Sequence, residues 1–410
     1  MLQSPAVESA ASASTPWMKW RELDLDALEH NYRAVRSRVG GAKRIIASVK
    51  ANAYGHGVVP VVRTLDRLGV YAVATASLDD ARAIRAAGLG TRILMFACVI
   101  PEAVDRLLAL NVVPTVHNRA IAEAISGAAA ESVEVYVKLD SGLGRLGVPV
   151  AEGVDFVQAI ARLPNLVIKG LYTHLPFTDA KGRDWAREGL ARFDRLLAEM
   201  ERKGLHVPVS QAISSAGIAA GLTDTCTAVC PGHLLYGRFL PLTPDLADLS
   251  EYRPVLRAIK CRLIEIGPRP AGERMGMNGA LVLPSPLIVG VVPFGIADGY
   301  RGPVAGRRAV MWLRGRRVPV LGVSLEYTLL GLTGLDGVKI GDEVMVLGES
   351  DGDRITVGEL AEWQGGSALE ALTSLDKPMP WLVHASGGRA CAPGVRDGNR
   401  PTGREASLGT

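Results

Sequence analysis

Short apolar runs recur every few tens of residues up to about residue 252, and stretches with helical spacing of their apolar positions separate them. The runs predict buried strands, and the intervening stretches predict helices. Alternation of this kind is typical of an α/β fold with a parallel sheet, and eight units favour a closed (β/α)8 TIM-type barrel. The strands are predicted at residues 44–50, 71–75, 92–97, 112–116, 133–139, 167–173, 207–213 and 227–235.

The pattern changes near residue 253. Helical spacing disappears, and short β-rich runs separated by Gly and Pro turns follow. Such runs predict an all-β domain, here over residues 253–385, which a helix near 356–363 interrupts. Its strands are predicted at residues 261–266, 281–292, 309–312, 318–321 and 343–347.

The two ends of the chain differ in composition from the predicted domains. Residues 1–16 are rich in Ala and Ser, and residues 386–410 are rich in Gly, Arg and Pro, so we expect both to be disordered. The barrel domain is then predicted to cover residues 17–252. Residues 17–24 are predicted as the first strand of this domain, and the alternative is that this strand packs with the β domain.

Composition excludes several classes of partner. Hydrophobic residues make up 48% of the 410 residues, enough for a sizeable core. The net charge of +4 is small for this length, so we expect no nucleic-acid partner. The Arg-Gly-Arg-Arg cluster at 314–317 predicts a solvated hairpin turn, with a local anion contact as the alternative. No apolar run reaches membrane-spanning length and no secretory signal is visible, so we expect a cytoplasmic protein without membrane contact.

Cysteines stand at positions 98, 226, 230, 261 and 391. The pair at 226 and 230 has neither a second pair nor a nearby histidine couple, which a zinc site would need. We therefore expect free thiols in a reducing compartment and no metal.

Polar and reactive residues gather at the carboxyl ends of the predicted barrel strands. The first strand ends at Lys50, the fifth at Lys138 and Asp140, the sixth at Thr173-His174, the seventh at Ser214-Ser215 and the eighth at Cys230-Pro231-Gly232. Barrel enzymes keep their active sites at this end. A partly desolvated lysine there can lose its proton and form a Schiff base, although a lone lysine at a strand end is more often simply solvated.

Residues 48–57, Ser-Val-Lys-Ala-Asn-Ala-Tyr-Gly-His-Gly, resemble the cofactor-lysine motif of the alanine racemases, a fold-type III family that uses pyridoxal 5′-phosphate (PLP). The resemblance extends over residues 17–382. It implies that Lys50 forms the Schiff base with PLP and then serves as acid/base on one face. It also implies that the Tyr54 hydroxyl binds the cofactor phosphate.

Residues 138–147, Lys-Leu-Asp-Ser-Gly-Leu-Gly-Arg-Leu-Gly, resemble a second motif of the family. The resemblance implies that Arg145 contacts the phenolic oxygen of PLP and the substrate carboxylate. The lysine that opens this motif is often carbamylated in the family, so Lys138 is a candidate for that modification. A buried Lys138 paired with Asp140 is the open alternative.

Three further stretches resemble cofactor contacts of the family. Thr173-His174 is similar to a Thr-His pair whose histidine packs on the pyridine ring, which assigns His174. Ser214-Ser215-Ala216 is similar to an Asn-Ser-Ala motif, which assigns Ser215 to the phosphate. Gly232 and His233 fall on the family's backbone phosphate contacts.

The chain also departs from the family pattern. Cys230 stands where an arginine pairs with the pyridine nitrogen, and a thiol carries no fixed positive charge. Met277 stands where the family has its second acid/base tyrosine, which the partner subunit supplies. Leu325 and Glu326 replace the usual Met and Asp at the substrate pocket, and Leu369 aligns with a phosphate-binding tyrosine.

The resemblance therefore implies a PLP-dependent, racemase-like isomerase acting at the α-carbon of an amino acid, as a homodimer with shared active sites. Tyr300, Tyr327, Asn278 or a water are candidates for the missing second base. The loss of the tyrosine leaves open a one-base aldolase, transaldolase or decarboxylase, which would prefer D-configured compounds because the family lysine serves that face. A PLP-binding protein without turnover is the third hypothesis.

Overall fold

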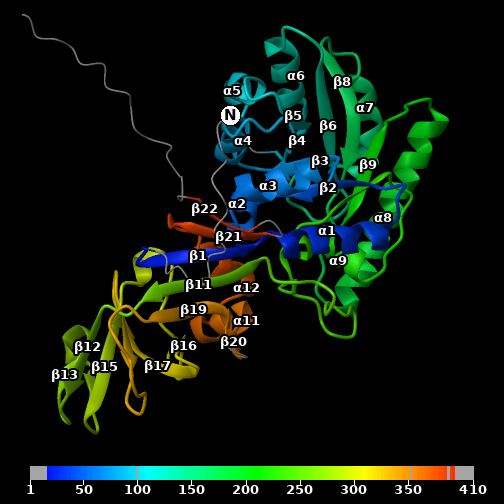
Figure 1. Cartoon of the computed structure of the whole chain (residues 1–410). Helices are drawn as coiled ribbons and strands as arrows, with labels where there is room; N and C mark the ends of the chain where they lie inside the picture. The colour runs from blue at the N-terminus through cyan, green and yellow to red at the C-terminus, as the bar shows by residue number, and fades with distance from the viewer. Residues whose placement is uncertain (1–15, 98–99, 351–352, 386–387, 393–410) are drawn as a thin grey trace, which may run out of the picture.

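The computed structural model describes residues 16–97, 100–350, 353–385 and 388–392. Within these residues, a parallel barrel and a large, mainly antiparallel sheet lie side by side along the long axis of the molecule (Figure 1). The disorder predicted for residues 1–15 and 393–410, and the free thiol predicted at position 98, lie outside the described residues.

The first sheet confirms the predicted (β/α)8 barrel. Its strands follow the order β5-β4-β3-β2-β10-β9-β8-β6, every neighbouring pair is parallel, and the β5–β6 pairing closes the cylinder. The short β7 (Val148–Pro149) extends β6. The barrel strands are β2 (Arg44–Ser48), β3 (Ala72–Thr75), β4 (Ile93–Met95), β5 (Val113–Val116), β6 (Val133–Asp140), β8 (Leu166–Tyr172), β9 (Val209–Ser214) and β10 (Ala228–Cys230).

Helices surround the barrel and present apolar faces to it. The eighth predicted strand, 227–235, was too long. Pro231 and Gly232 follow β10, and a short helix begins at His233, because proline cannot donate to a strand ladder. The helices are α1 (Leu25–Val39), α2 (Lys50–Gly55), α3 (Val58–Arg67), α4 (Leu78–Ala86), α5 (Val104–Leu108), α6 (Arg119–Ala128), α7 (Gly153–Ile160), α8 (Ala180–Arg202), α9 (Ser215–Ala219) and α10 (His233–Tyr236).

The second domain is all-β apart from short helices. Its sheet follows the order β12-β15-β18-β17-β16-β19-β11-β1-β21-β22, with β20 paired to β19. Its elements are β11 (Leu256–Arg262), β12 (Glu265–Arg269), β13 (Arg274–Met275), β14 (Leu281–Val282), β15 (Leu287–Val292), β16 (Val310–Leu313), β17 (Arg316–Val323), β18 (Thr328–Gly331), β19 (Glu343–Ser350), β20 (Asp353–Ile355), α11 (Val357–Gln364), α12 (Ala368–Ser374) and β21 (Trp381–Ala385).

Two strands predicted for this domain are each divided in the structure. The predicted strand 261–266 is broken at residues 263–264, between β11, which pairs with β19, and β12, which pairs with β15. The backbone N–H groups of these two residues bond to the carbonyl oxygens of Asp342 and Val291. The predicted strand 281–292 is broken at Pro284 and Pro286, because proline interrupts strand pairing. At 314–317 the structure has the predicted hairpin turn, with positive φ at Arg314 and Gly315.

Both ends of the described chain lie in the second sheet. β1 (Lys19–Asp24) pairs antiparallel with β11 and parallel with β21, and α1 leads from it to the barrel. β22 (Gly388–Ala392) pairs with β21, so the prediction of disorder from residue 386 is wrong for these residues. A strand edge offers unpaired backbone groups that a following segment can use, which composition alone does not reveal.

Candidate active site

A cavity of about 860 Å³ opens at the carboxyl ends of the barrel strands. It gathers residues that the sequence assigned from widely separated motifs. Predicted residues along its wall are Lys50, Tyr54, Lys138, Arg145, His174, Ser214, Ser215, Cys230, Gly232 and His233.

Lys50 and Tyr54 stand at the two ends of one unusual turn. The four residues Ala51 to Tyr54 all have left-handed backbone angles, with φ between 51° and 55°. Each non-glycine residue in a left-handed helix costs about 1–2 kcal/mol, so the surrounding structure must hold this turn. The turn brings the Lys50 ammonium nitrogen to 5.7 Å from the centre of the Tyr54 ring.

Burial lowers the pKa of Lys50, and the nearby Arg145 lowers it further, whereas Cys230 acts in the opposite direction. A lowered pKa increases the share of neutral amine, the form that attacks a carbonyl carbon. Lys50 therefore meets the chemical requirement for a Schiff-base lysine.

Hydroxyl and backbone N–H groups converge near Ser215. Its Oγ accepts hydrogen bonds from the N–H of Gly232 at 2.8 Å and the N–H of Leu234 at 3.3 Å. A Cβ atom at position 232 would lie 2.3 Å from the Tyr54 hydroxyl oxygen, so only glycine lets that hydroxyl approach this loop. The Tyr54 hydroxyl also lies 3.4 Å from Ser48 Oγ. The Tyr54 and Ser215 hydroxyls are donors that fit the phosphate of PLP, and the buried Thr173 hydroxyl, without a partner in the described structure, adds a free donor to the cavity.

The loop after β6 is shaped by Asp140. Its carboxylate accepts the N–H groups of Gly142 and Gly144, each at 2.9 Å. Lys138 donates instead to the carbonyl of Leu139 at 2.9 Å, and the described structure contains no direct ion pair between Lys138 and Asp140. Burial lowers the pKa of Lys138 to about 7, although Asp140 opposes this shift.

Three other groups at the cavity are neutral at pH 7. Burial lowers the pKa of His174 to about 3 and that of His233 to about 4, and the nearby Lys50 lowers both further. Burial also raises the pKa of the Cys230 thiol to about 12, against the opposing effect of Lys50. A flat, uncharged imidazole suits packing against an aromatic ring, whereas a neutral thiol provides no positive charge for a ring nitrogen.

The residues predicted in the β domain lie elsewhere. Leu325 and Glu326 are exposed between β17 and β18, and neither is among the described residues of the cavity wall. Met277 begins the single turn η3 (Met277–Gly279), which contacts β13. Figure 1 shows β13 at the end of the molecule away from the barrel. Leu369 is 38% exposed on α12.

Tyr300 is ruled out as a replacement base. Its side chain is completely buried, and its ring packs edge-on against Phe294 with the centroids 5.9 Å apart. A side chain enclosed in the β-domain core has no access to a substrate. Tyr327, which is 46% exposed, and the exposed Asn278 keep access to solvent.

The cavity wall also contains residues that the sequence analysis missed. Phe96 and Tyr172 follow or end barrel strands, so the strand-end criterion that selected Lys50 could have found them. The Tyr172 hydroxyl lies 3.1 Å from Thr115 Oγ1, and Lys138 lies 5.2 Å from the centre of its ring. Trp185, on α8, carries no comparable sequence signal.

Among the described residues, no group of three or more His, Cys, Asp or Glu side chains could hold a metal ion. None of the described helices combines the length and apolar character needed to cross a bilayer.

Comparison with known proteins covers nearly the whole chain. A family model for the N-terminal domain of alanine racemase matches residues 23–239, and one for the C-terminal domain matches residues 256–383. The alanine racemase of Halothermothrix orenii is 30% identical over 365 residues, which are 88% of this chain and 95% of that protein. That of Thermodesulfovibrio yellowstonii is 31% identical over 362 residues, covering 86% and 94%.

Solved structures give the same picture of the fold. The alanine racemase of Clostridium difficile 630 superposes with a TM-score of 0.85 at 21% identity, covering 93% of this chain and 99% of that one. The enzyme from Streptomyces lavendulae, described as a D-cycloserine producer, gives a TM-score of 0.80 at 26% identity, covering 91% and 98%.

Proposed function

The chain belongs to the alanine racemase family, and from this premise we propose that it is a PLP-dependent amino-acid racemase acting at the substrate α-carbon through Lys50. The observation that carries the proposal is the meeting of the Lys50 amine, the Tyr54 hydroxyl and the Ser215 hydroxyl in one cavity. Bound PLP would supply an electron sink for negative charge at the α-carbon.

Lys50 has two tasks in this proposal. Its neutral amine, favoured by burial, would hold the cofactor, and it would take and return a proton at the substrate α-carbon on one face. Tyr54, Ser215 and the backbone N–H groups of Gly232 and His233 would hold the phosphate.

Three more side chains orient the reactants. Arg145 would bind the substrate carboxylate and the phenolic oxygen of the cofactor, and neutral His174 would pack on its pyridine ring. The neutral Cys230 thiol would offer the ring nitrogen no positively charged partner.

Lys138 is proposed to be carbamylated and to hold Arg145 in place. Carbamylation joins the unprotonated amine to carbon dioxide and releases a proton. A pKa of about 7 leaves a large share of Lys138 in the reactive form at neutral pH, which supports the proposal.

We propose a homodimer in which Met277, Leu325 and Glu326 of a second copy approach the cavity. Support comes from three apolar or aromatic side chains on neighbouring β-domain loops, Ile296, Leu325 and Tyr327, which are 50%, 66% and 46% exposed. Grouped exposed apolar side chains mark interaction surfaces. Light scattering that reports a monomer would contradict this proposal.

A one-base aldolase, transaldolase or decarboxylase is the second candidate. The burial of Tyr300 favours it, because it removes Tyr300 from the candidate second bases. Tyr327, Asn278 or a bound water would then have to protonate the opposite face in a racemase.

One experiment separates these functions. The protein, reconstituted with PLP, is incubated with D- and L-alanine and with D- and L-serine in D2O, and α-hydrogen loss and configuration are followed by NMR and chiral chromatography. Exchange and interconversion of both enantiomers support the racemase. Exchange of the D-form alone, with retention, supports one-base chemistry. No exchange, while Lys50 still binds PLP covalently, would contradict both enzyme functions for these substrates.

A further inference from the structure

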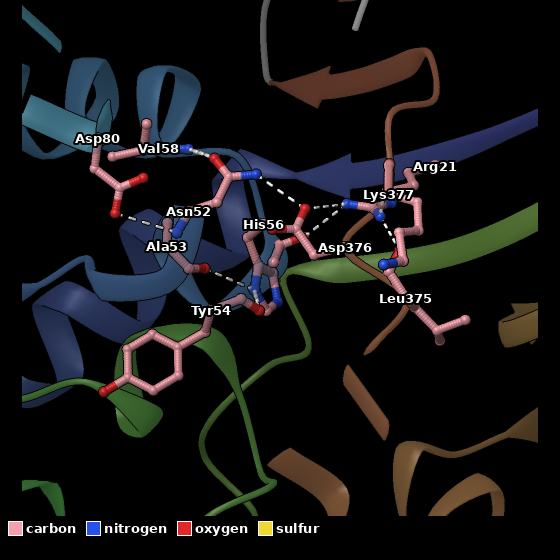
Figure 2. A network of polar contacts seen from close by, with 11 residues as sticks. Arg21, Asn52, Ala53, Tyr54, His56, Val58, Asp80, Leu375, Asp376 and Lys377 are labelled. Atoms are coloured by element: carbon pink, nitrogen blue, oxygen red, sulfur yellow. Dashed lines mark hydrogen bonds and ion pairs between the residues drawn. The ribbon is translucent and has the colours of Figure 1, made fainter. Parts of the chain in front are cut away.

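The left-handed turn that carries Lys50 and Tyr54 rests on the second domain of the same chain. Figure 2 shows Asn52, in the middle of the turn, directed toward Asp376, which follows α12. The Asn52 side-chain NH2 donates to Asp376 Oδ1 at 3.0 Å. A residue of the cofactor turn is thus bonded to a carboxylate more than 300 positions away.

Arg21, from β1, completes this contact. Its side chain is 1% exposed, and Nη1 donates both to Asp376 Oδ1 at 3.0 Å and to the carbonyl of Gly55 at 3.1 Å. Its second terminal nitrogen donates to the carbonyl oxygens of Leu375 and Lys377. Arg21 therefore joins the end of the turn to the segment that follows α12.

The barrel holds the other side of Asn52. The Asn52 side-chain oxygen accepts the N–H of Val58 at 2.8 Å, at the start of α3. The Asn52 N–H donates to Asp80 Oδ2 at 3.3 Å, and Asp80 also accepts the Thr75 hydroxyl at 2.9 Å. Asn52 consequently lies between the barrel and the β domain, and each of its polar groups bonds to one of them.

We propose that Asp376 and Arg21 are positioning residues that act through Asn52 and Gly55 to hold the left-handed turn, and so set where Lys50 and Tyr54 meet the cofactor. This inference rests on the proposed function of Lys50. The turn needs external support because four consecutive non-glycine residues adopt an unfavourable backbone conformation. The β domain thereby acts on the cofactor site within one chain.

Both hydrogen bonds to Asp376 end at the same oxygen, and this allows a sharp test. Asp376→Ala removes the acceptor, whereas Asp376→Asn keeps one acceptor oxygen, replaces the other oxygen with an NH2 group and removes the negative charge. Asn52→Ala breaks the link while leaving the Arg21–Asp376 pair intact, which guards against a variant that fails to fold. Glu22→Gln is the matched control, because Glu22 also lies on β1 but bonds to Lys260 and His384, away from the turn.

The first measurement is hydrogen–deuterium exchange of peptides covering residues 50–58 in protein without PLP. The second is the affinity for PLP and the pH titration of the absorbance of PLP bound to Lys50. We expect Asp376→Ala and Asn52→Ala to speed exchange in this peptide and to weaken PLP binding by about tenfold each, as loss of hydrogen bonds to a charged group predicts. Asp376→Asn should keep both the exchange rate of this peptide and the PLP affinity close to the wild-type values. Glu22→Gln should change neither quantity.

Equal exchange and PLP affinity in Asp376→Ala and Glu22→Gln would overturn the inference and leave the proposed function standing. Failure of the wild-type protein to bind PLP at Lys50 would instead overturn the proposed function. In that case the exchange comparison still decides whether Asp376 holds the turn.

Discussion

The barrel and the β domain differ in how they meet the candidate site. The barrel brings amines, hydroxyls, a guanidinium and two neutral imidazoles to one cavity from separate strand ends. The β-domain residues with family counterparts at the substrate pocket, Leu325 and Glu326, lie instead on exposed surface of the same chain. A closed parallel barrel gathers its strand ends automatically, whereas loops of an open sheet gain a shared site only by meeting another surface.

This difference teaches that the two halves can change independently. The groups proposed to hold the cofactor are within one cavity, while Leu325 and Glu326 are not among the described residues of its wall. The contact of Asp376 with Asn52 is the exception, because it connects the β domain to the cofactor turn inside one chain.

The largest effect tests the barrel half. Lys50→Ala should abolish covalent attachment of PLP, measured by borohydride reduction and mass spectrometry, and lower α-hydrogen exchange by about 10³-fold or more, because the same amine attaches the cofactor and moves the proton. Lys203→Ala, at the exposed end of α8, is the control and should behave like the wild type. Exchange that survives in Lys50→Ala would remove this lysine from the chemistry.

The next effect tests the β-domain half. Met277→Tyr should raise the rate at which enantiomers interconvert by about 10²-fold, because it provides an acid/base group on the face opposite Lys50. Chiral chromatography after incubation with L-alanine measures the rate. An unchanged rate in a variant that forms the proposed homodimer would mean that position 277 does not reach the substrate. The difference between the barrel and the β domain would then need another explanation.

A smaller effect concerns the phosphate contacts. Ser215→Ala should weaken PLP binding by about tenfold, since a hydrogen bond to a charged group is lost. Equilibrium titration of the apoprotein with PLP measures this. Ser210→Ala is the matched control, because Ser210 is a buried serine on β9, the strand that leads directly into Ser215, and its hydroxyl accepts a hydrogen bond from the N–H of Thr227. Equal affinities in the two variants would argue against a phosphate at Ser215.

The smallest effect concerns Lys138. Its pKa lies near 7, so the amine is protonated and unreactive toward carbon dioxide below this pH and becomes reactive above it. Carbamylation should therefore increase as the pH rises through about 7 and disappear as the pH falls below it. Carbon-13 NMR with labelled bicarbonate measures the carbamate, and Lys138→Met should remove the signal. A pH-independent absence of carbamate would leave Lys138 as a buried amine bonded to Leu139.

Most of the barrel could be predicted from sequence because each strand has a recognisable pattern within its own few residues. Buried strands read as short apolar runs, and the reactive residues that follow them sit at one end of any such barrel. The prediction failed at 227–235, where an apolar run continued into α10, since apolar periodicity alone does not separate a short strand from a short buried helix.

The β domain was harder to predict because its strands pair over long distances. β1 pairs with β11 and β21, which lie hundreds of residues later in the chain. The local sequence pattern of a strand does not indicate which distant strand it pairs with. Tyr300 was one of the candidate second bases from sequence, yet its burial against Phe294 removes it.

The sequence by itself determined the strand and helix rhythm, the cofactor-lysine stretch and the departures at Cys230 and Met277, because these depend on residue type and short-range spacing. Only the tertiary structure decided that four residues after Lys50 turn left-handed, and that Asp376 and Arg21 hold them. The physical reason is that an unfavourable backbone conformation persists only where distant groups support it, and those groups become neighbours only when the chain has folded.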